Sequence, residues 1–164
     1  MRNVFLSYQI FDFIAIFCPF YPTPQKIVAQ KPKTISSKEE FEFIKTHCMQ
    51  GANMLRRLEN FEDEPLLQTA YDIARWHHER WDGRGYPDGL KGNDIPISAQ
   101  IVSLADVYDA LTSERCYKKA FSHETAMRMI LNGECGAFNP LLLECLTDIQ
   151  AELQEKPQNI AVNR

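Results

Sequence analysis

The sequence predicts an all-α protein, a bundle of helices without a sheet. From Pro24 onward, apolar residues recur every three or four positions, which is the spacing of one helix face. Alternation of apolar and polar residues is nowhere long enough to indicate a strand, and no internal repeat is visible. The composition, 45% hydrophobic and 24% charged, is ordinary for a globular chain with a single core.

The first 23 residues differ from the rest of the chain. They are rich in phenylalanine and isoleucine, but Asp12 interrupts the apolar stretch and Pro19 ends it. Such a stretch is too short for a membrane-spanning helix, and Cys18-Pro19-Phe20 is a poor signal-peptide cleavage site. We interpret residues 1–23 as an atypical apolar leader or a replaced N-terminus, with no membrane span.

Five helices are expected after this leader. They cover 36–58, 65–78, 98–113, 122–130 and 140–153, and residues 156–164 are expected to form a frayed tail. Ser36 and Glu39 have the spacing of a capping box, and Pro65 and Pro140 are suited to first helical positions. Residues 81–92 contain four glycines and one proline, which predicts a loop. The stripes expected to face the core include Phe41, Ile44, Cys48, Leu55, Leu66, Ala70, Ile101, Leu104, Leu111, Cys145, Leu146 and Ile149.

Charge and cysteine usage exclude some classes of function. A net charge of −4 gives no electrostatic footprint for nucleic acid, so a phosphate-bearing ligand would need local cations or a metal. The five cysteines are scattered, without a Cys-x-x-Cys pair. We interpret them as reduced thiols of a cytoplasmic protein, filling core and surface positions rather than binding zinc.

Four side chains are candidate metal ligands. His47 lies on the inward face of the first helix, and His77 and His78 end the second. Asp106 and Asp109 share one side of the third helix and would repel each other without a nearby cation. Each residue taken singly also fits a hydrogen-bonded core histidine or a solvated carboxylate. Spacing alone therefore supports a mixed histidine and carboxylate metal site without naming its reaction.

One run of residues carries a family resemblance. His77-His78-Glu79-Arg80-Trp81-Asp82-Gly83-Arg84-Gly85-Tyr86-Pro87 resembles the signature of HD-GYP domains. Downstream, Ile95-Pro96, the run from Ala105 to Ser113, and the run from Arg115 to Lys118 follow the order and spacing of that family. The resemblance covers residues 24–155, which it identifies as a partial HD-GYP domain.

The resemblance implies a helical bundle of the HD superfamily that hydrolyses cyclic di-GMP in bacterial signalling. The family holds two or three iron or manganese ions. The positions that match its metal ligands are His47, His77, His78 and Asp106. Asp106, Arg115 and Lys118 match catalytic positions, the two cations facing substrate phosphates. Tyr86 matches a substrate-contacting loop position, although a purely structural turn explains it equally well. Diguanylate cyclase domains are an implied partner of this loop.

The sequence departs from the family at one motif. By position, His-Asp-x-Gly-Lys is expected with its His-Asp near Ile16-Phe17 and its lysine near Phe20, and none of these residues is present. We therefore expect the first helices to be missing or replaced, fewer metal ions, and an inactive chain. A non-catalytic signalling module of the same family remains open. Hydrolysis of another nucleotide phosphoester is a further alternative, which the GYP signature disfavours.

Overall fold

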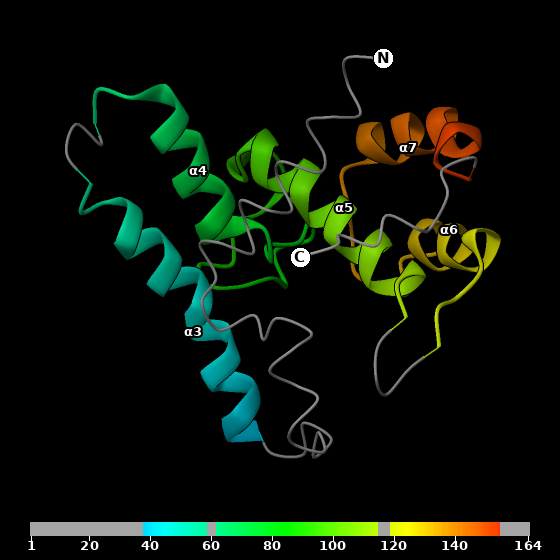
Figure 1. The fold of residues 1–164 in the computed structure, drawn as a ribbon, viewed down its shortest axis with the longest axis horizontal. Helices are drawn as coiled ribbons and strands as arrows, with labels where there is room; N and C mark the ends of the chain where they lie inside the picture. The colour runs from blue at the N-terminus through cyan, green and yellow to red at the C-terminus, as the bar shows by residue number, and fades with distance from the viewer. Residues whose placement is uncertain (1–37, 59–61, 115–118, 155–164) are drawn as a thin grey trace, which may run out of the picture.

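A computed structural model describes residues 38–58, 62–114 and 119–154 (Figure 1). Within these ranges the chain is helical and contains no strand. The elements in chain order are α3 Lys38–Leu55, α4 Pro65–Trp76, the 3-10 helix η1 Gly92–Asp94, α5 Ile97–Thr112, α6 His123–Leu131 and α7 Pro140–Gln154. The predicted all-α class is confirmed. None of the described helices is long and apolar enough to cross a membrane.

Helix boundaries follow local residue chemistry. Pro65 occupies the start of α4, where its missing N–H costs nothing. Ser122 caps α6, its hydroxyl accepting a hydrogen bond from the Thr125 amide at 3.3 Å. Ser36 of the predicted capping box lies outside the described residues. Helix α4 ends at Trp76, two residues earlier than expected, so His77 is its C-cap.

Two groups of buried apolar side chains hold the helices together. One lies between α3 and α4 and contains Ala52, Leu55, Ala70 and Tyr71. The other joins α5, α6 and α7 and contains Leu104, Leu111, Ala126, Met127, Ile130, Phe138 and Leu146. Helix α4 also packs on α5. Helix α4 therefore contacts α3 on one side and α5 on another.

Several residues expected to face the core are exposed. They are Phe41, Ile44, Leu66, Ile101, Cys145 and Ile149. Periodicity shows which residues share a helix face, but it does not show how far along that face a neighbouring helix extends. On α5 the buried side chains include Val102 and Leu104, so the buried face is rotated away from Ile101. The stripes were right for Cys48, Leu55, Ala70, Leu104, Leu111 and Leu146, which are all buried.

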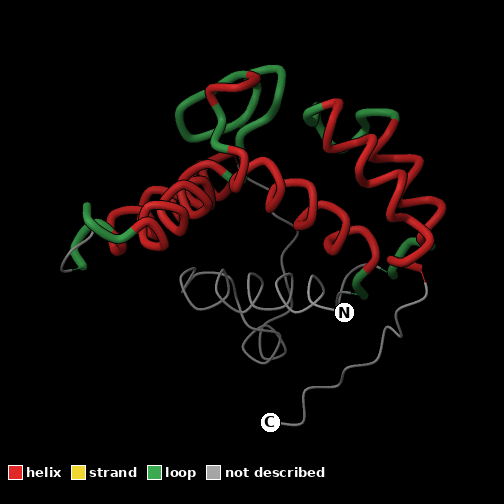
Figure 2. Tube along the Cα trace, turned by 90° about the horizontal axis from the view of Figure 1, so that it is seen from above, coloured by secondary structure: helices red, strands yellow, loops and turns green. Residues whose placement is uncertain are grey.

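Residues 77–96 connect α4 to α5 as a loop that carries η1 (Figure 2). The Asp88 carboxylate accepts hydrogen bonds from Arg75 Nε at 2.7 Å, Arg75 Nη2 at 3.0 Å and Trp76 Nε1 at 2.7 Å. Glu79 Oε1 accepts the backbone amides of Asp88 and Gly89 at 2.7 and 3.0 Å. We call these four side chains, Arg75, Trp76, Glu79 and Asp88, the loop anchor. The predicted loop over 81–92 is confirmed, and the hydrogen bonds of the anchor stabilise its conformation.

Gly85 allows the loop to fold back on its own start. A Cβ atom at this position would overlap the backbone of Glu79 and Arg80. The Tyr86 amide then donates to the His78 carbonyl at 3.2 Å. The glycine thus brings Tyr86 next to the two histidines that end α4.

Candidate metal centre

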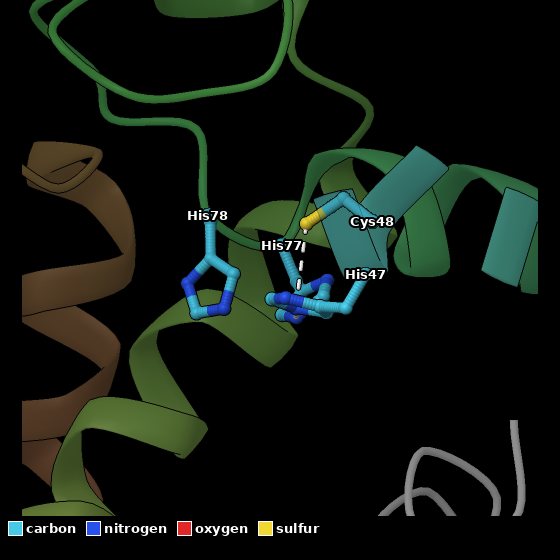
Figure 3. Close-up of side chains that lie close together, drawn as sticks. All are labelled: His47, Cys48, His77 and His78. Atoms are coloured by element: carbon cyan, nitrogen blue, oxygen red, sulfur yellow. Dashed lines mark hydrogen bonds between the residues drawn. The ribbon is translucent and has the colours of Figure 1, made fainter. Parts of the chain in front are cut away.

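Three histidines and one cysteine gather where α3 meets the end of α4 (Figure 3). One possible ligand atom from each of His47, Cys48, His77 and His78 lies within 4.8 Å of all the others. We call these four residues the His/Cys cluster. Gly51 is buried on α3 one turn after His47.

The His47 and His77 rings are oriented by carbonyls of their own helices. His47 Nδ1 lies 2.6 Å from the Ile44 carbonyl, and His77 Nδ1 lies 2.8 Å from the Ile73 carbonyl. Because a carbonyl only accepts, each Nδ1 must carry the proton in these contacts, which leaves each Nε2 with a lone pair. The two Nε2 atoms are 3.4 Å apart. Two lone pairs that face each other attract only a proton or a cation, and carbonyl-bound imidazoles are the usual form of metal-binding histidine.

Cys48 completes the same side of the cluster. Its side chain is fully buried, and its Sγ lies 3.4 Å from His47 Nε2. At this distance the Cys48 thiol is able to donate a hydrogen bond to His47 Nε2. Cysteine, like neutral imidazole, is a ligand for zinc, iron or copper once it loses its proton.

His78 forms the outer part of the cluster, toward the loop. Its ring centroid is 4.2 Å from that of His77 and 4.8 Å from that of Tyr86, on which it stacks with an interplanar angle of 28°. Lys45 Nζ lies 5.7 Å from the centre of the Tyr86 ring. The edge of the cluster therefore carries one aromatic face and one ammonium group.

Burial keeps the imidazoles of His77 and His78 neutral. Loss of water contact, followed by the proximity of His47, lowers the pKa of His77 to about 4. The pKa of His78 is also well below its usual range, mainly because of burial and then because of His77. At neutral pH both rings are deprotonated, which is the form that binds a metal.

The structure brings together three of the four predicted metal ligands. Asp106 is half-buried on α5 and is not part of the His/Cys cluster, so its role as a ligand stays a prediction. The cation found near it is Arg80, whose pKa is lowered by burial and raised in part by Asp106. Asp109 instead accepts a hydrogen bond from the Ser113 hydroxyl at 2.9 Å. Arg115 and Lys118 lie outside the described residues.

Two residues at the site were missed from the sequence. Cys48 was interpreted as a filler because the five cysteines are scattered along the chain without a Cys-x-x-Cys pair. Lys45 had no distinguishing pattern, since a lysine on a helix is most often solvated. The adjacency of cysteine and histidine at 47–48 was the available signal for Cys48.

Comparisons with known proteins point to one family. The model of a family described as the HD domain matches residues 20–137. The chain is 44% identical over 108 residues to a probable cyclic di-GMP phosphodiesterase of Vibrio cholerae, covering 65% of this chain and 24% of the relative. It is 40% identical over 121 residues to a cyclic di-GMP phosphodiesterase of Thermotoga maritima, covering 74% of this chain and 32% of the relative.

A third relative acts on a different cyclic dinucleotide. It is the 3'3'-cGAMP-specific phosphodiesterase 2 of V. cholerae, 36% identical over 121 residues, which cover 74% of this chain and 22% of the relative. The chain spans less than a third of the length of each of these three relatives.

Proposed function

The chain belongs to the HD domain family, within the HD-GYP group whose signature it carries, and we propose that it contributes to a phosphodiesterase that hydrolyses cyclic di-GMP. The family binds divalent metals, and the His/Cys cluster fits such an ion. The observation that carries the proposal is that the Nε2 lone pairs of His47 and His77 lie 3.4 Å apart in a partly buried cluster. The relatives named for cyclic di-GMP supply the substrate class.

The proposed ligands are His47, His77, His78 and Asp106, and the proposed metal is iron or manganese. When bound, such an ion lowers the pKa of a water molecule and absorbs charge on the departing oxygen. The carbonyls of Ile44 and Ile73 hold the His47 and His77 rings in the tautomer that leaves Nε2 available. Asp106 would join them from α5, where Arg80 is its cationic neighbour.

The loop residues are proposed to bind the substrate. Tyr86 is held against His78 by the close turn at Gly85, and its ring offers a flat surface for a base. Arg115 and Lys118 are proposed to meet the phosphates, a role that a chain of net charge −4 must give to local cations. Asp106 is proposed to act at the same place as a catalytic carboxylate. Lys45 lies beside Tyr86 and is a third candidate cation.

Two further proposals concern the cellular context. No disulfide joins the described cysteines Cys48, Cys135 and Cys145 to one another, which fits a reducing compartment such as the cytoplasm. A diguanylate cyclase domain is proposed as a partner of the loop. A pull-down of a diguanylate cyclase domain with wild type and with Tyr86→Ala tests this second proposal. If the variant still binds metal but no longer captures the domain, the contact lies at the loop.

The activity test must allow for the missing motif. Residues 1–164 contain no His-Asp pair, and we propose that this polypeptide by itself binds cyclic di-GMP weakly without turning it over. The assay therefore compares it with a chimera in which a segment carrying His-Asp-x-Gly-Lys replaces residues 1–23. With manganese or iron, the chimera should release linear dinucleotide or GMP.

The variants His77→Ala and Asp106→Ala should abolish this product. His123→Ala is the matched control, because His123 lies on α6 and hydrogen-bonds Tyr108 instead. Faster turnover of 3'3'-cGAMP than of cyclic di-GMP would change the substrate, and turnover that survives His77→Ala would refute the proposed site.

A further inference from the structure

We propose that Cys48 is a fourth ligand of the cluster and that the resulting site, three imidazoles and one thiolate, selects zinc. The inference rests on the metal site proposed above and adds to it a ligand that the resemblance does not assign. Cys48 also changes the metal that the site prefers.

The spacing of the ligand atoms supports a single tetrahedral ion. With zinc–nitrogen bonds of about 2.0–2.1 Å and a zinc–sulfur bond of about 2.3 Å, neighbouring ligand atoms in a tetrahedral site lie about 3.3–3.6 Å apart. His47 Nε2 lies 3.4 Å from His77 Nε2 and 3.4 Å from Cys48 Sγ. The remaining separations in the cluster are all within 4.8 Å, so small movements of the side chains complete the set.

The chemistry of the four groups agrees with this geometry. His47 and His77 present Nε2 to the ion, since their Nδ1 atoms donate to carbonyls of their own helices. The Cys48 S–H bond breaks when the metal–sulfur bond forms, and the proton leaves to solvent. The site then carries one negative charge against the two positive charges of the ion, in a buried place that disfavours larger net charge.

A thiolate changes the order of metal preference. Soft sulfur ligands favour zinc, whereas oxygen ligands favour manganese. A site with four protein ligands is also closed, which is typical of structural zinc and leaves no position for a water molecule. Zinc held in this way would exclude the ion proposed for hydrolysis, so zinc should inhibit any manganese-dependent activity of the site.

The first test uses cobalt as a spectroscopic probe. Cys18, Cys116, Cys135 and Cys145 are replaced by serine, so that Cys48 is the one remaining cysteine. Cobalt(II) should then produce a thiolate-to-metal charge-transfer band in the near ultraviolet, together with the visible bands of a tetrahedral ion, and zinc should remove both. A cobalt complex without a charge-transfer band would overturn the proposal.

The second test compares the metal preference of single variants. Cys48→Ser should weaken zinc binding by at least about 100-fold, more than the loss of an indirect contact would, and should leave manganese binding unchanged. It should also remove one of the protons released per zinc bound. Cys145→Ser, an exposed cysteine on α7, is the matched control and should change neither.

The outcomes separate this inference from the proposed function. If manganese binds while zinc affinity is equal in wild type and Cys48→Ser, the cluster is a metal site without a sulfur ligand, and only this inference fails. If neither ion binds, both fail. Should Cys48→Ser not fold, the cobalt spectrum of the protein that retains Cys48 still decides the question.

Discussion

The loop anchor and the His/Cys cluster both take residues from the segment 75–79, yet their polar groups differ in how they pair. In the anchor, donors meet acceptors: the Asp88 carboxylate faces the Arg75 guanidinium and the Trp76 indole, and Glu79 Oε1 faces two backbone amides. In the cluster, acceptor meets acceptor: the Nε2 atoms of His47 and His77, neither of which carries a proton when Nδ1 does, lie 3.4 Å apart.

The difference separates stability from binding. The anchor is completed by the chain itself, so its groups stabilise one conformation of the loop. The facing acceptors of the cluster are satisfied by a cation. They therefore favour binding of a metal ion, and they lower the stability of the metal-free chain. One atom of the anchor breaks the pattern, since Glu79 Oε2 is buried without a hydrogen-bond partner in the described part of the chain. Burial accordingly raises the pKa of Glu79.

The largest expected effect is stabilisation of the cluster by its ion. Zinc at about 1,000 times its dissociation constant should raise the free energy of unfolding by about 4 kcal/mol, because the ion binds the folded state. His77→Ala should remove this gain and leave the stability of the metal-free chain nearly unchanged. Chemical denaturation with and without zinc measures both. An equal gain in wild type and variant would place the ion elsewhere.

A change in the anchored loop should instead lower the stability of the metal-free chain. Gly85→Ala should lower the free energy of unfolding of the metal-free chain by about 3 kcal/mol, because the new Cβ overlaps the backbone of Glu79 and Arg80. Gly92→Ala is the control: its φ is +57° but no atom lies within 4 Å of the added Cβ, so it should cost only about 1 kcal/mol. Equal costs would mean that close packing is unimportant in this loop.

As pH falls, the metal-free chain should lose the stability contributed by the neutral histidines of the cluster before it loses that of the Arg75–Asp88 ion pair. The pKa of His77 is about 4 when folded and 6.5 ordinarily, so the unfolded chain binds more protons between these values and stability falls as pH falls. From pH 7 to pH 5 the loss should be about 2 kcal/mol from His77, and His78 acts in the same direction. Arg75 and Trp76 lower the pKa of Asp88, whose contribution is lost only as pH falls below its usual value of 3.8.

The double variant His77→Gln, His78→Gln isolates this effect. The raised pKa of Glu79 gives a contribution of opposite sign, and it is present in both proteins. The difference between wild type and double variant should therefore show the histidine contribution alone. Parallel stability curves for the two proteins from pH 7 to pH 5 would contradict the prediction.

The smallest expected effect concerns the partly exposed ion pair of the anchor. Asp88→Asn should cost about 1 kcal/mol, because solvent screens the pair and the amide keeps part of the hydrogen bonding to Arg75 and Trp76. Asp148→Asn, on the exposed side of α7, should cost nothing measurable. Asp88→Asn should leave zinc affinity unchanged, and a large loss of zinc affinity in this variant would show that the anchor and the cluster are coupled.

Much of the fold was predictable from the sequence because helix signals are local. Pro65, Ser122 and Pro140 start helices within a residue of the expected positions, and the apolar period placed Leu55, Ala70 and Leu146 in the core. Leu66 and Ile101 were misplaced for a different reason. Their burial depends on where neighbouring helices end, which no local pattern contains.

The sequence by itself determined the helical class and the loop after α4, because each follows from spacing along one chain segment. The three histidines were proposed as ligands through the family resemblance of the run that starts at His77. Only the tertiary structure decided which atoms meet: that α3 brings His47 and Cys48 to His77, that Tyr86 stacks on His78, and that Asp106 acts electrostatically on Arg80. The physical reason is one of range. Helix propensity and capping act over a few residues, whereas the match between a donor and an acceptor depends on distances between helices, and those are set by side-chain packing.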